Sequence, residues 1–392
     1  MMGVEDLEDH KKLSILRSQL KGITVKETMM AEFPTVDPED KVSEALSKMR
    51  ASGFQEIPII EGGNYAGMIS YGTILRKGNI APDTKVKNLV RNLPTVALDT
   101  EMTKIAEHIV ANNCRQLAVL NGKKVIGVVS RSGLTKVAAG MKILKDIKVY
   151  EIMTAPVESV TKSGMLDDAM EIMRRLDVRT VPVVGADGAP VGIVGMNEII
   201  DNHWKTDTKS FGDFKKSAKA QISIDGVYAS AVVTIDWDET MGSAAALMEE
   251  RGISTLPVVE GKEMVGIITE YDIVELISAS RERESLFVQL SGLDEEDKMY
   301  ADSMYADIEA GMSRVSKMYK PESLIIHISR YNEEGGRKKY SLTAKLFIHG
   351  TVVNAKEVGW DIVKVNNDLM RKLGQLVTAM KDSTVTLRKR KR

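Results

Sequence analysis

The sequence predicts a mixed fold: an α/β region built from a repeated unit, followed by an α+β domain of order βαβββα, with two helices on one face of a four-stranded sheet. Two observations predict it. One signature recurs four times before residue 280, and a different order of helical and strand periodicities follows residue 285. Charge divides in the same way, because residues 310–392 hold 18 Lys+Arg and 7 Asp+Glu, a net of +11 in a chain of net −1.

Each copy of the repeat contains a short apolar strand and, nine or ten residues after its second position, a glycine followed by two apolar residues. The four strands and their glycines are Ile57–Ile60 with Gly67, Leu117–Leu120 with Gly127, Val181–Val184 with Gly192, and Leu256–Val259 with Gly266. An amphipathic helix precedes the strand, and a turn rich in glycine or asparagine separates the strand from the glycine. Each unit therefore reads strand, helix, hairpin, helix.

These residues resemble the CBS domain, named after cystathionine β-synthase, over roughly residues 23–278. The resemblance implies two tandem CBS-pair modules, formed by repeats 1 and 2 and by repeats 3 and 4. An α/β array with only a structural or dimerising role is the alternative. The expected segments are an N-terminal helix over 1–22 and repeats over 23–80, 81–145, 146–204 and 205–280, the last with a preceding insertion.

Members of this family often bind adenine nucleotides or S-adenosyl compounds between paired repeats. The informative position is a Ser or Thr after the glycine run, with an Asp three residues later, because that carboxylate accepts hydrogen bonds from ribose hydroxyls. Only repeat 4 has both, Thr269 and Asp272. The other repeats have Ser70 with Thr73, Ser130 with Gly133, and Gly195 with Glu198. A plain helix cap is the alternative interpretation of Thr269 and Asp272.

Further site residues are expected in the module of repeats 3 and 4. Thr255 and Pro257 precede the repeat-4 site, and Arg179 and Thr180 hold the matching places in repeat 3. Arg179 is the candidate phosphate ligand, because a guanidinium matches phosphate geometry. We expect no required cofactor and a regulatory adenine nucleotide (AMP, ADP or ATP) in this module.

After residue 280 the pattern predicts a strand at Leu286–Leu290, an amphipathic helix to about Tyr319, three strands, and a last helix over about 361–380 that buries Leu376. This order resembles the ribosome hibernation-promoting factor family over roughly residues 285–382, with a basic tail at 383–392. The resemblance is carried by Leu290-Ser291-Gly292, Lys317–Lys320, Tyr340–His349 and Arg371-Lys372. Together with the repeats it is most similar to archaeal CBS-repeat ribosome hibernation or dimerisation factors.

That resemblance implies binding to ribosomal RNA at the messenger and transfer-RNA sites of the small ribosomal subunit. Basic side chains neutralise phosphate without reading sequence, which suits recognition of folded RNA by shape. The terminal run of five basic residues is expected to be disordered when free. The candidate RNA-binding residues are Arg314, Lys317, Lys320, Arg337, Lys338, Lys339, Lys364, Arg371, Lys372, Lys381, Arg388, Lys389, Arg390, Lys391 and Arg392.

The sequence lacks the motifs of several enzyme classes and the features of disulfide-bonded and membrane proteins. There is no Walker A loop, GxGxxG or HExxH, the lone Cys114 cannot form an intramolecular disulfide, and no apolar stretch reaches the roughly 18 residues of a membrane span. The N-terminus has no apolar signal core. We therefore expect a cytoplasmic protein without catalytic activity, metal or membrane partner.

Two functions remain as hypotheses. In the first, the C-terminal domain blocks the messenger and transfer-RNA sites of the small ribosomal subunit, while the repeats contact or bridge subunits and sense adenine nucleotides. Homo-oligomers would form through the CBS modules. In the second, the chain senses an adenine nucleotide or an S-adenosyl compound and regulates a protein partner.

Overall fold

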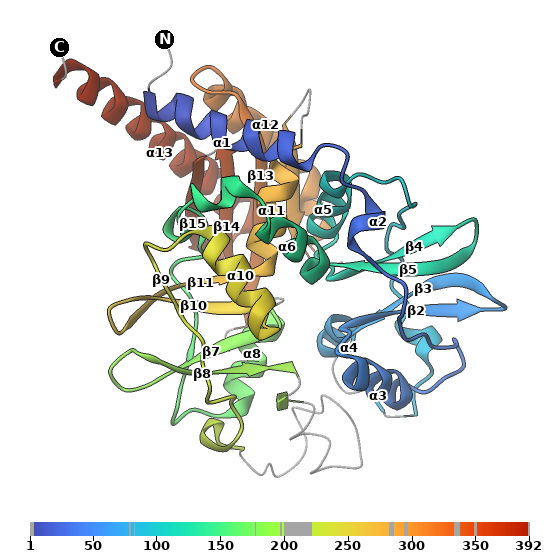
Figure 1. Cartoon of the computed structure of the whole chain (residues 1–392). Coiled ribbons are helices and arrows are strands. Elements are labelled where there is room, and N and C mark those ends of the chain that lie inside the picture. Colours follow the sequence, from blue (N-terminus) through green and yellow to red (C-terminus); the bar gives the residue numbers. More distant parts are fainter. Residues whose placement is uncertain are drawn as a thin grey trace. The chain divides into compact units, whose positions relative to one another are not determined.

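The computed structural model describes residues 4–77, 80–81, 83–176, 178–196, 198–199, 222–281, 286–293, 297–332, 338–348 and 351–390. They form two compact units. The repeat unit is Leu20–Ser278, and the second unit joins residues 1–19 to residues 279–392. The mixed α/β and α+β fold is confirmed (Figure 1). The sequence did not lead us to expect that the N-terminal helix α1 (Val4–Leu20) would belong almost entirely with the C-terminal domain.

The first two repeats have the predicted helix, hairpin, helix order. Repeat 1 contains α2 (Val25–Thr28), β1 (Met29–Met30), α3 (Val42–Ser52), β2 (Glu56–Glu61), β3 (Asn64–Ser70) and α4 (Tyr71–Lys77). Repeat 2 contains the 3-10 turn η1 (Val86–Leu89), α5 (Met102–Ala111), β4 (Gln116–Asn121), β5 (Lys124–Ser130) and α6 (Arg131–Ala139). The expected leading strands shrink to single parallel bridges, Val36 to Ile59 and Val96 to Val119.

Repeats 3 and 4 follow the same plan with slightly longer leading strands. Repeat 3 contains η2 (Lys142–Lys145), α7 (Val149–Ile152), β6 (Val160–Thr161), α8 (Leu166–Leu176), β7 (Thr180–Val184) and β8 (Pro190–Gly195). Repeat 4 contains η3 (Ile224–Gly226), β9 (Ile235–Asp236), α10 (Met241–Arg251), β10 (Thr255–Glu260), β11 (Glu263–Thr269) and α11 (Glu270–Ala279). Most of the insertion before repeat 4, residues 201–221, lies outside the described residues.

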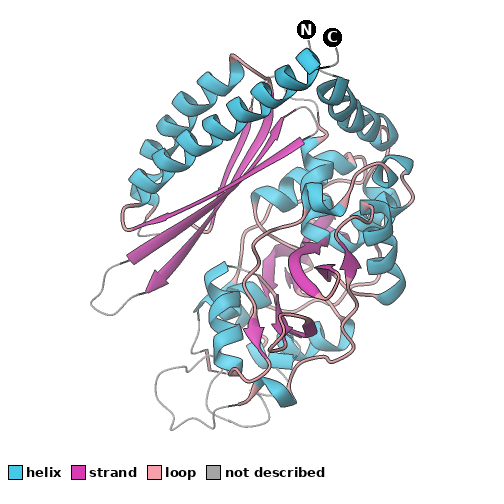
Figure 2. Ribbon diagram, turned by 90° about the vertical axis from the view of Figure 1, so that its left-hand side faces the viewer, coloured by secondary structure: helices cyan, strands magenta, loops and turns pink. Residues whose placement is uncertain are grey.

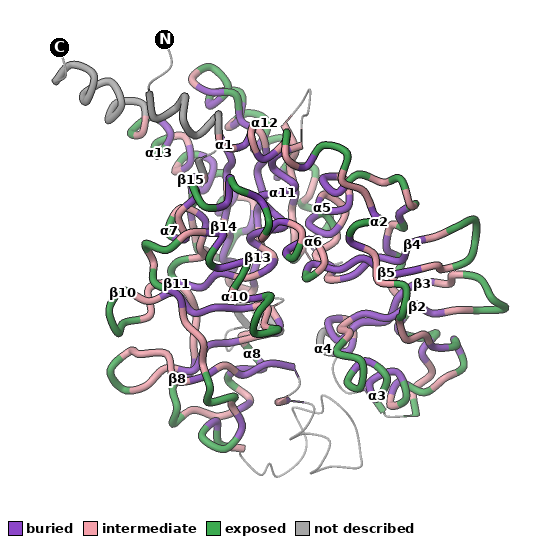
Figure 3. The backbone as a smooth tube through the Cα atoms, in the orientation of Figure 1, coloured by how far each residue is buried: buried purple, intermediate pink, exposed green. Residues whose placement is uncertain are grey.

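The helical periodicity of the repeats correctly predicts their core. On α3, Val42, Ala45, Leu46 and Met49 are all buried, at the predicted i, i+3, i+4, i+7 spacing. This face belongs to one apolar cluster that also contains the α8 face of repeat 3. The hairpin strands are buried along most of their length while their turns are exposed (Figure 3). Burial of these faces against each other holds the four repeats in one unit.

Repeats pair two by two at the residue just before each apolar strand. In the first module the Glu56 backbone N–H donates to Gln116 Oε1 at 2.8 Å, and the Gln116 N–H donates to Glu56 Oε2 at 2.8 Å. In the second module the hydroxyls of Thr180 and Thr255 are 3.0 Å apart. Because these four positions are equivalent in the repeat, each module has pseudo-two-fold symmetry, with neighbouring hairpins such as β2–β3 and β4–β5 side by side (Figure 1).

The glycine of every repeat lies where the partner repeat's leading segment crosses it. A Cβ on Gly67, Gly127, Gly192 or Gly266 would overlap Val90, Met29, Tyr228 or Met153, respectively. Backbone hydrogen bonds fix the crossing, as between Thr154 and Ile267 at 2.9 and 3.1 Å. The glycines therefore recur because any side chain would push the paired repeats apart.

The C-terminal domain has the predicted βαβββα order. Its elements are β12 (Phe287–Ser291), η4 (Lys298–Tyr300), α12 (Ala301–Ser316), β13 (Pro321–Asn332), β14 (Lys338–Ile348), β15 (Thr351–Gly359) and α13 (Ile362–Arg390). The sheet order is β12-β13-β14-β15, with β12 parallel to β13 and the other pairs antiparallel. Two helices cover one face of this sheet (Figure 2).

The last helix differs from the sequence expectation in two ways. It runs through Arg390, so most of the segment predicted as a separate disordered tail is helical, and only Lys391 and Arg392 lie outside the described residues. Leu376, expected in the core, is 38% exposed, while its neighbour Val377 is fully buried. Val377 continues the spacing of Val365, Leu369 and Leu373, which directs it to the sheet.

Candidate functional site

Thr269 and Asp272 form a reciprocal cap at the start of α11. Thr269 is the last residue of β11, and both its backbone N–H and its hydroxyl donate to Asp272 Oδ2, at 2.8 and 2.7 Å. The Tyr271 N–H donates back to Thr269 Oγ1 at 3.2 Å. Asp272 is only 3% exposed. The helix-cap interpretation therefore accounts for Oδ2 of Asp272 but not for its other carboxylate oxygen, Oδ1.

The other repeats keep this cap with different residues. The N–H groups of Thr73 and Gly133 donate to Ser70 and Ser130, both at 3.0 Å, and the Gly195 N–H donates to Glu198 Oε2 at 2.8 Å. In repeat 2 a Cβ at Gly133 would lie 2.8 Å from the Thr28 carbonyl oxygen. The first module thus has no carboxylate at this position, and repeat 2 has no room for one.

The second oxygen of Asp272 faces the partner repeat. The Thr154 hydroxyl, in the segment of repeat 3 that crosses Gly266, donates to Asp272 Oδ1 at 3.4 Å. This bond is long compared with the 2.7 Å bond on Oδ2, so its hydroxyl is the weaker of the two partners. Thr154 was not expected from the sequence, because only the crossing of the repeats brings it beside Asp272.

Thr255, Pro257 and Thr180 lie next to this site on the paired strands. Thr255 is directly opposite Thr269 across the β10–β11 hairpin, and Pro257 is opposite Ile267. Thr180 reaches the group through the hydroxyl of Thr255. The structure therefore brings together five of the residues singled out in repeats 3 and 4.

The side chain of Arg179 reaches toward repeat 1. It is 7% exposed, donates from Nη1 to the Val178 carbonyl at 3.1 Å, and its guanidinium occupies the space that a side chain at Gly72 would take. Gly72 lies at the start of α4 in repeat 1. The equivalent arginine of repeat 2 is Arg115, whose charge acts on Glu270 at the start of α11. Arg115 is thus an arginine close to the repeat-4 site. Its position in repeat 2, equivalent to that of Arg179 in repeat 3, is the sequence feature that could have identified it.

Arg131 adds a second guanidinium at this place. Its Nε donates to the Cys114 carbonyl at 2.8 Å and its Nη2 donates to Asn113 Oδ1 at 3.1 Å. The guanidinium lies over the Tyr271 ring, 4.3 Å from the ring centre. Tyr271 precedes Asp272, so this cation–π contact ties repeat 2 to the helix start of repeat 4.

The electrostatics at this junction combine several arginines with buried carboxyl groups. Burial lowers the pKa of Arg115 to about 9, with the charges of Arg131 and Arg179 acting in the same direction. Burial raises the pKa of Glu270, against a hydrogen bond from Ser132 and the charges of Arg115 and Arg131. The charges of Glu270 and Glu56 oppose the lowering of the Arg115 pKa, so Arg115 lies among charged groups of both signs. We call Arg115, Arg131 and Arg179 the arginine cluster.

The candidate RNA-binding residues are spread over the C-terminal domain. Lys338 is 3.6 Å from Asp297, Lys372 pairs with Glu357 at 2.9 Å, and Lys339 lies over Trp360. Lys317, Lys320 and Lys364 are exposed, while Arg314 and Arg371 line a common groove. Arg337, Lys391 and Arg392 lie outside the described residues, and nothing is described of the side chains of Lys381, Arg388, Lys389 and Arg390.

Three further features bear on function. Within the described part of the chain, no three His, Cys, Asp or Glu side chains group as metal ligands would. Its helices likewise include none with the length and apolar character that crossing a membrane requires. Cys114 is buried, which raises the pKa of its thiol well above the ordinary value.

Four similar units that pair two by two through crossed leading segments define a tandem-repeat α/β protein. The chain belongs to the CBS domain family, whose model matches residues 25–79, 86–140, 149–204 and 225–279. The pairing of repeats 1 with 2 and 3 with 4, expected from the resemblance, agrees with that membership.

Relatives share most of the chain. MJ1404 of Methanocaldococcus jannaschii is 29% identical over 331 residues, 81% of this chain and 77% of that protein. A 33.4 kDa protein in a ribosomal RNA operon of Thermofilum pendens is 23% identical over 274 residues, 64% of this chain and 90% of that protein. The solved structure of MJ1225 from M. jannaschii, described as a proposed archaeal homologue of g-AMPK, has a TM-score of 0.56 at 20% identity. It covers 64% of this chain and 99% of that one, and shows the fold alone.

Proposed function

We propose that the chain is a sensor of adenine nucleotides, with its ligand in the module of repeats 3 and 4. The carrying observation is the position of two members of the arginine cluster at the start of α11, in the one repeat that has both Thr269 and Asp272: Arg131 lies over the Tyr271 ring, and the charges of Arg115 and Arg131 act on Glu270. A ribose and a phosphate joined in one molecule match these two neighbouring features.

Asp272 would hold the ribose. Its Oδ2 is committed to the cap, so the ribose hydroxyls would donate to Oδ1 in place of the long bond from Thr154. A hydrogen bond from a neutral donor to a buried carboxylate contributes about 1.5–3 kcal/mol, which is enough to select a ribose over an unsubstituted ring. Capping and ligand binding are then two roles of one side chain.

The arginine cluster would hold the phosphate and decides between the ligand classes. A nucleotide phosphate is attracted by Arg115 and Arg131, whereas the sulfonium of S-adenosylmethionine is a cation that the same groups repel. The cluster therefore favours AMP, ADP or ATP over S-adenosyl compounds. The charges of Arg115 and Arg131 lower the pKa of Glu270, but burial raises it more and favours the neutral carboxyl group.

Isothermal titration calorimetry of the full chain with AMP tests this proposal. We expect one saturable site per chain, since repeats 1 to 3 lack the paired hydroxyl and carboxylate. Titration of Ser130→Ala, which removes the equivalent cap of repeat 2, serves as the control and should give the same affinity. Absence of saturable heat with the wild type, or a clearly lower AMP affinity in Ser130→Ala than in the wild type, would contradict the proposal.

Binding to ribosomal RNA is the second candidate function, for the C-terminal domain. One structural feature favours it: α13 continues thirteen residues past Val377, the last of its residues described as buried, and this extension carries Arg388, Lys389 and Arg390. The likeness to the T. pendens protein, named for its ribosomal RNA operon, is in keeping with this candidate. Occupation of the messenger and transfer-RNA sites, and bridging of subunits by the repeats, remain predictions from the resemblance to hibernation-promoting factors.

Co-sedimentation of the full chain with small ribosomal subunits tests the second candidate. Replacing residues 388–392 by glutamine removes five positive charges, so we expect binding to weaken by orders of magnitude near physiological salt. The control replaces five exposed lysines of the repeat unit by glutamine: Lys21, Lys41, Lys123, Lys124 and Lys262. Equal loss in both variants, or no sedimentation of the wild type, would remove this candidate.

A further inference from the structure

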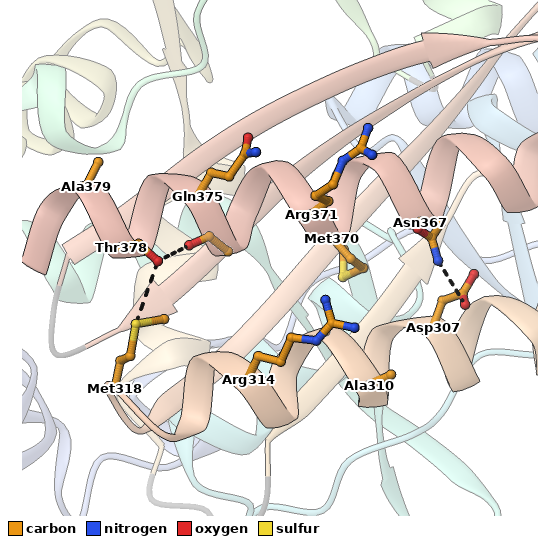
Figure 4. A pocket seen from close by; sticks show the side chains of 12 residues that line it. Asp307, Ala310, Arg314, Met318, Asn367, Met370, Arg371, Gln375, Thr378 and Ala379 are labelled. Carbon is orange, nitrogen blue, oxygen red and sulfur yellow. Dashed lines mark hydrogen bonds between the residues drawn. The ribbon is translucent and has the colours of Figure 1, made fainter.

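A groove lies between the outer faces of α12 and α13, away from the sheet. Three contacts show that the helices run parallel: Asn366 to the Met304 carbonyl at 3.1 Å, Asn367 to Asp307 at 3.3 Å, and Thr378 to Met318 Sδ at 3.7 Å. The groove has a volume of about 580 Å³ (Figure 4). On α12 its lining runs from Asp307 to Arg314, about 10 Å along the axis, and it continues to Met318 just after the end of that helix.

The groove contains two glycines, Gly311 and Gly374, and only the first is explained by helix packing. A Cβ on Gly311 would lie 3.0 Å from Met370 Cβ, so this glycine serves the packing of α12 on α13. A Cβ on Gly374 would meet no atom within 4 Å. Glycine in a helix interior costs about 0.5–1 kcal/mol relative to alanine, and packing among the described residues of this domain does not explain it. An open backbone at Gly374 suits a partner that approaches α13 closely.

The groove is lined by charged side chains of both signs, namely Asp307, Arg314 and Arg371. Asp307 accepts from Asn367, and Arg371 pairs with Asp368 at 2.9 Å. Arg314 is exposed, forms no ion pair among the described residues, and reaches into the space between the helices beside Met370 (Figure 4). A nucleic acid backbone needs a larger surplus of cations than this lining provides, because Asp307 lies in the same groove and Arg371 already pairs with Asp368 just outside it. A partner with both signs of charge does fit.

We propose that a second copy of this chain docks on the groove, with α12 antiparallel to α12 of its partner. The order of residues along α12 is self-complementary about a point between Ala310 and Gly311. When Ala310 faces Gly311 of the other copy, Asp307 faces Arg314 of the other copy, and the reverse. The two small residues allow close approach at the centre, and two ion pairs flank them about 10 Å apart.

The two-fold rotation that relates the two copies of α12 also places α13 opposite α13 of the other copy. The contacts between the helices align Gly311 with Met370, so α13 of one copy would lie antiparallel to α13 of the other around Met370. Asp368 and Arg371 then face their opposites across the axis, as Asp307 and Arg314 do. Gly374 lies one turn away, at the point where the second helix would otherwise meet a side chain. The apolar floor, Met370 and Ala310, becomes the buried centre of the interface.

Charge-swap variants of the full chain, compared by sedimentation velocity over a concentration series, test the interface. Arg314→Asp places aspartates opposite one another and acts twice by symmetry, so we expect the dimer dissociation constant to rise at least about tenfold. Asp307→Arg should do the same by placing arginines opposite one another. The double variant Asp307→Arg/Arg314→Asp restores the pairing and should recover most of the affinity. Glu309→Arg, on an exposed α12 position outside the groove, is the matched control.

Gly374→Trp supplies a test that does not depend on charge. The space above Gly374 is empty, so the variant should fold, with a melting temperature near that of the wild type, and should be monomeric. A wild-type chain that stays monomeric at high concentration would overturn the proposal. So would a dimer that persists in Gly374→Trp, or single and double charge variants that behave alike. RNA bound at the groove would also overturn it, and would show as binding that Arg314→Asp weakens and Asp307→Arg strengthens.

Discussion

Replacement of Asp272 by alanine is expected to weaken AMP binding by roughly tenfold to a hundredfold. The variant removes the carboxylate that would accept the ribose hydroxyls, and loss of a hydrogen bond to a charged group costs about 1.5–3 kcal/mol. The cap on α11 is lost as well, at about 1 kcal/mol of unfolding free energy. Calorimetric titration with AMP and urea denaturation of the same sample measure the two effects separately.

A variant in another repeat distinguishes loss of the helix cap from loss of the ligand site. Ser130→Ala removes a cap of the same kind in repeat 2 and should lower the unfolding free energy by a similar amount, with AMP affinity unchanged. If Asp272→Ala lost stability but kept wild-type affinity for AMP, the carboxylate would be a cap alone. The sensor would then need another ribose ligand.

The second large effect is expected from Arg115→Met. Methionine keeps much of the apolar stem but removes the guanidinium, so AMP affinity should fall by about tenfold or more while adenosine affinity stays the same. The free protein should not lose stability, because burial and the charges of Arg131 and Arg179 already disfavour the charge of Arg115, as its lowered pKa shows. Parallel titrations with AMP and adenosine, and thermal melts without ligand, check both statements.

Arg179→Met is the matched variant for this prediction. Arg179 holds the same place in its repeat, but its guanidinium lies against Gly72 at the start of α4. Its effect on AMP binding should therefore be smaller than that of Arg115→Met. An equal loss of adenosine and AMP affinity in Arg115→Met, or a larger loss in Arg179→Met, would place the phosphate elsewhere.

Much of the fold follows from short-range patterns in the sequence. Residues such as Val42, Leu46 and Met49 predict a buried helix face, because helical spacing is a local property. The clean alternation from Tyr340 predicts β14 for the same reason. The four glycines were visible as a signature, but their cause was not. That cause is the crossing of a segment from the partner repeat, which local patterns do not contain.

The candidate site shows the same limit. Thr269 and Asp272 are three residues apart and were predicted together, whereas Thr154 lies 118 residues away from Asp272 and joins it only through the crossing at Gly266. Arg179 was assigned to the repeat-4 site from its place in repeat 3, but the contacts between modules put it beside repeat 1. The end of the last helix was also predicted wrongly. We expected it at about residue 380, but α13 continues to Arg390, and helix ends are the least certain part of a prediction from local sequence.

The central claim is that a phosphate-bearing adenine ligand binds beside Asp272 and the arginine cluster. Side-by-side calorimetric titration of the full chain with AMP, adenosine and S-adenosylmethionine tests it most directly. AMP should bind with the highest affinity, adenosine more weakly because it lacks the phosphate, and S-adenosylmethionine most weakly because its sulfonium is repelled by the guanidiniums of Arg115 and Arg131. An S-adenosylmethionine affinity equal to or above that of AMP would contradict the account.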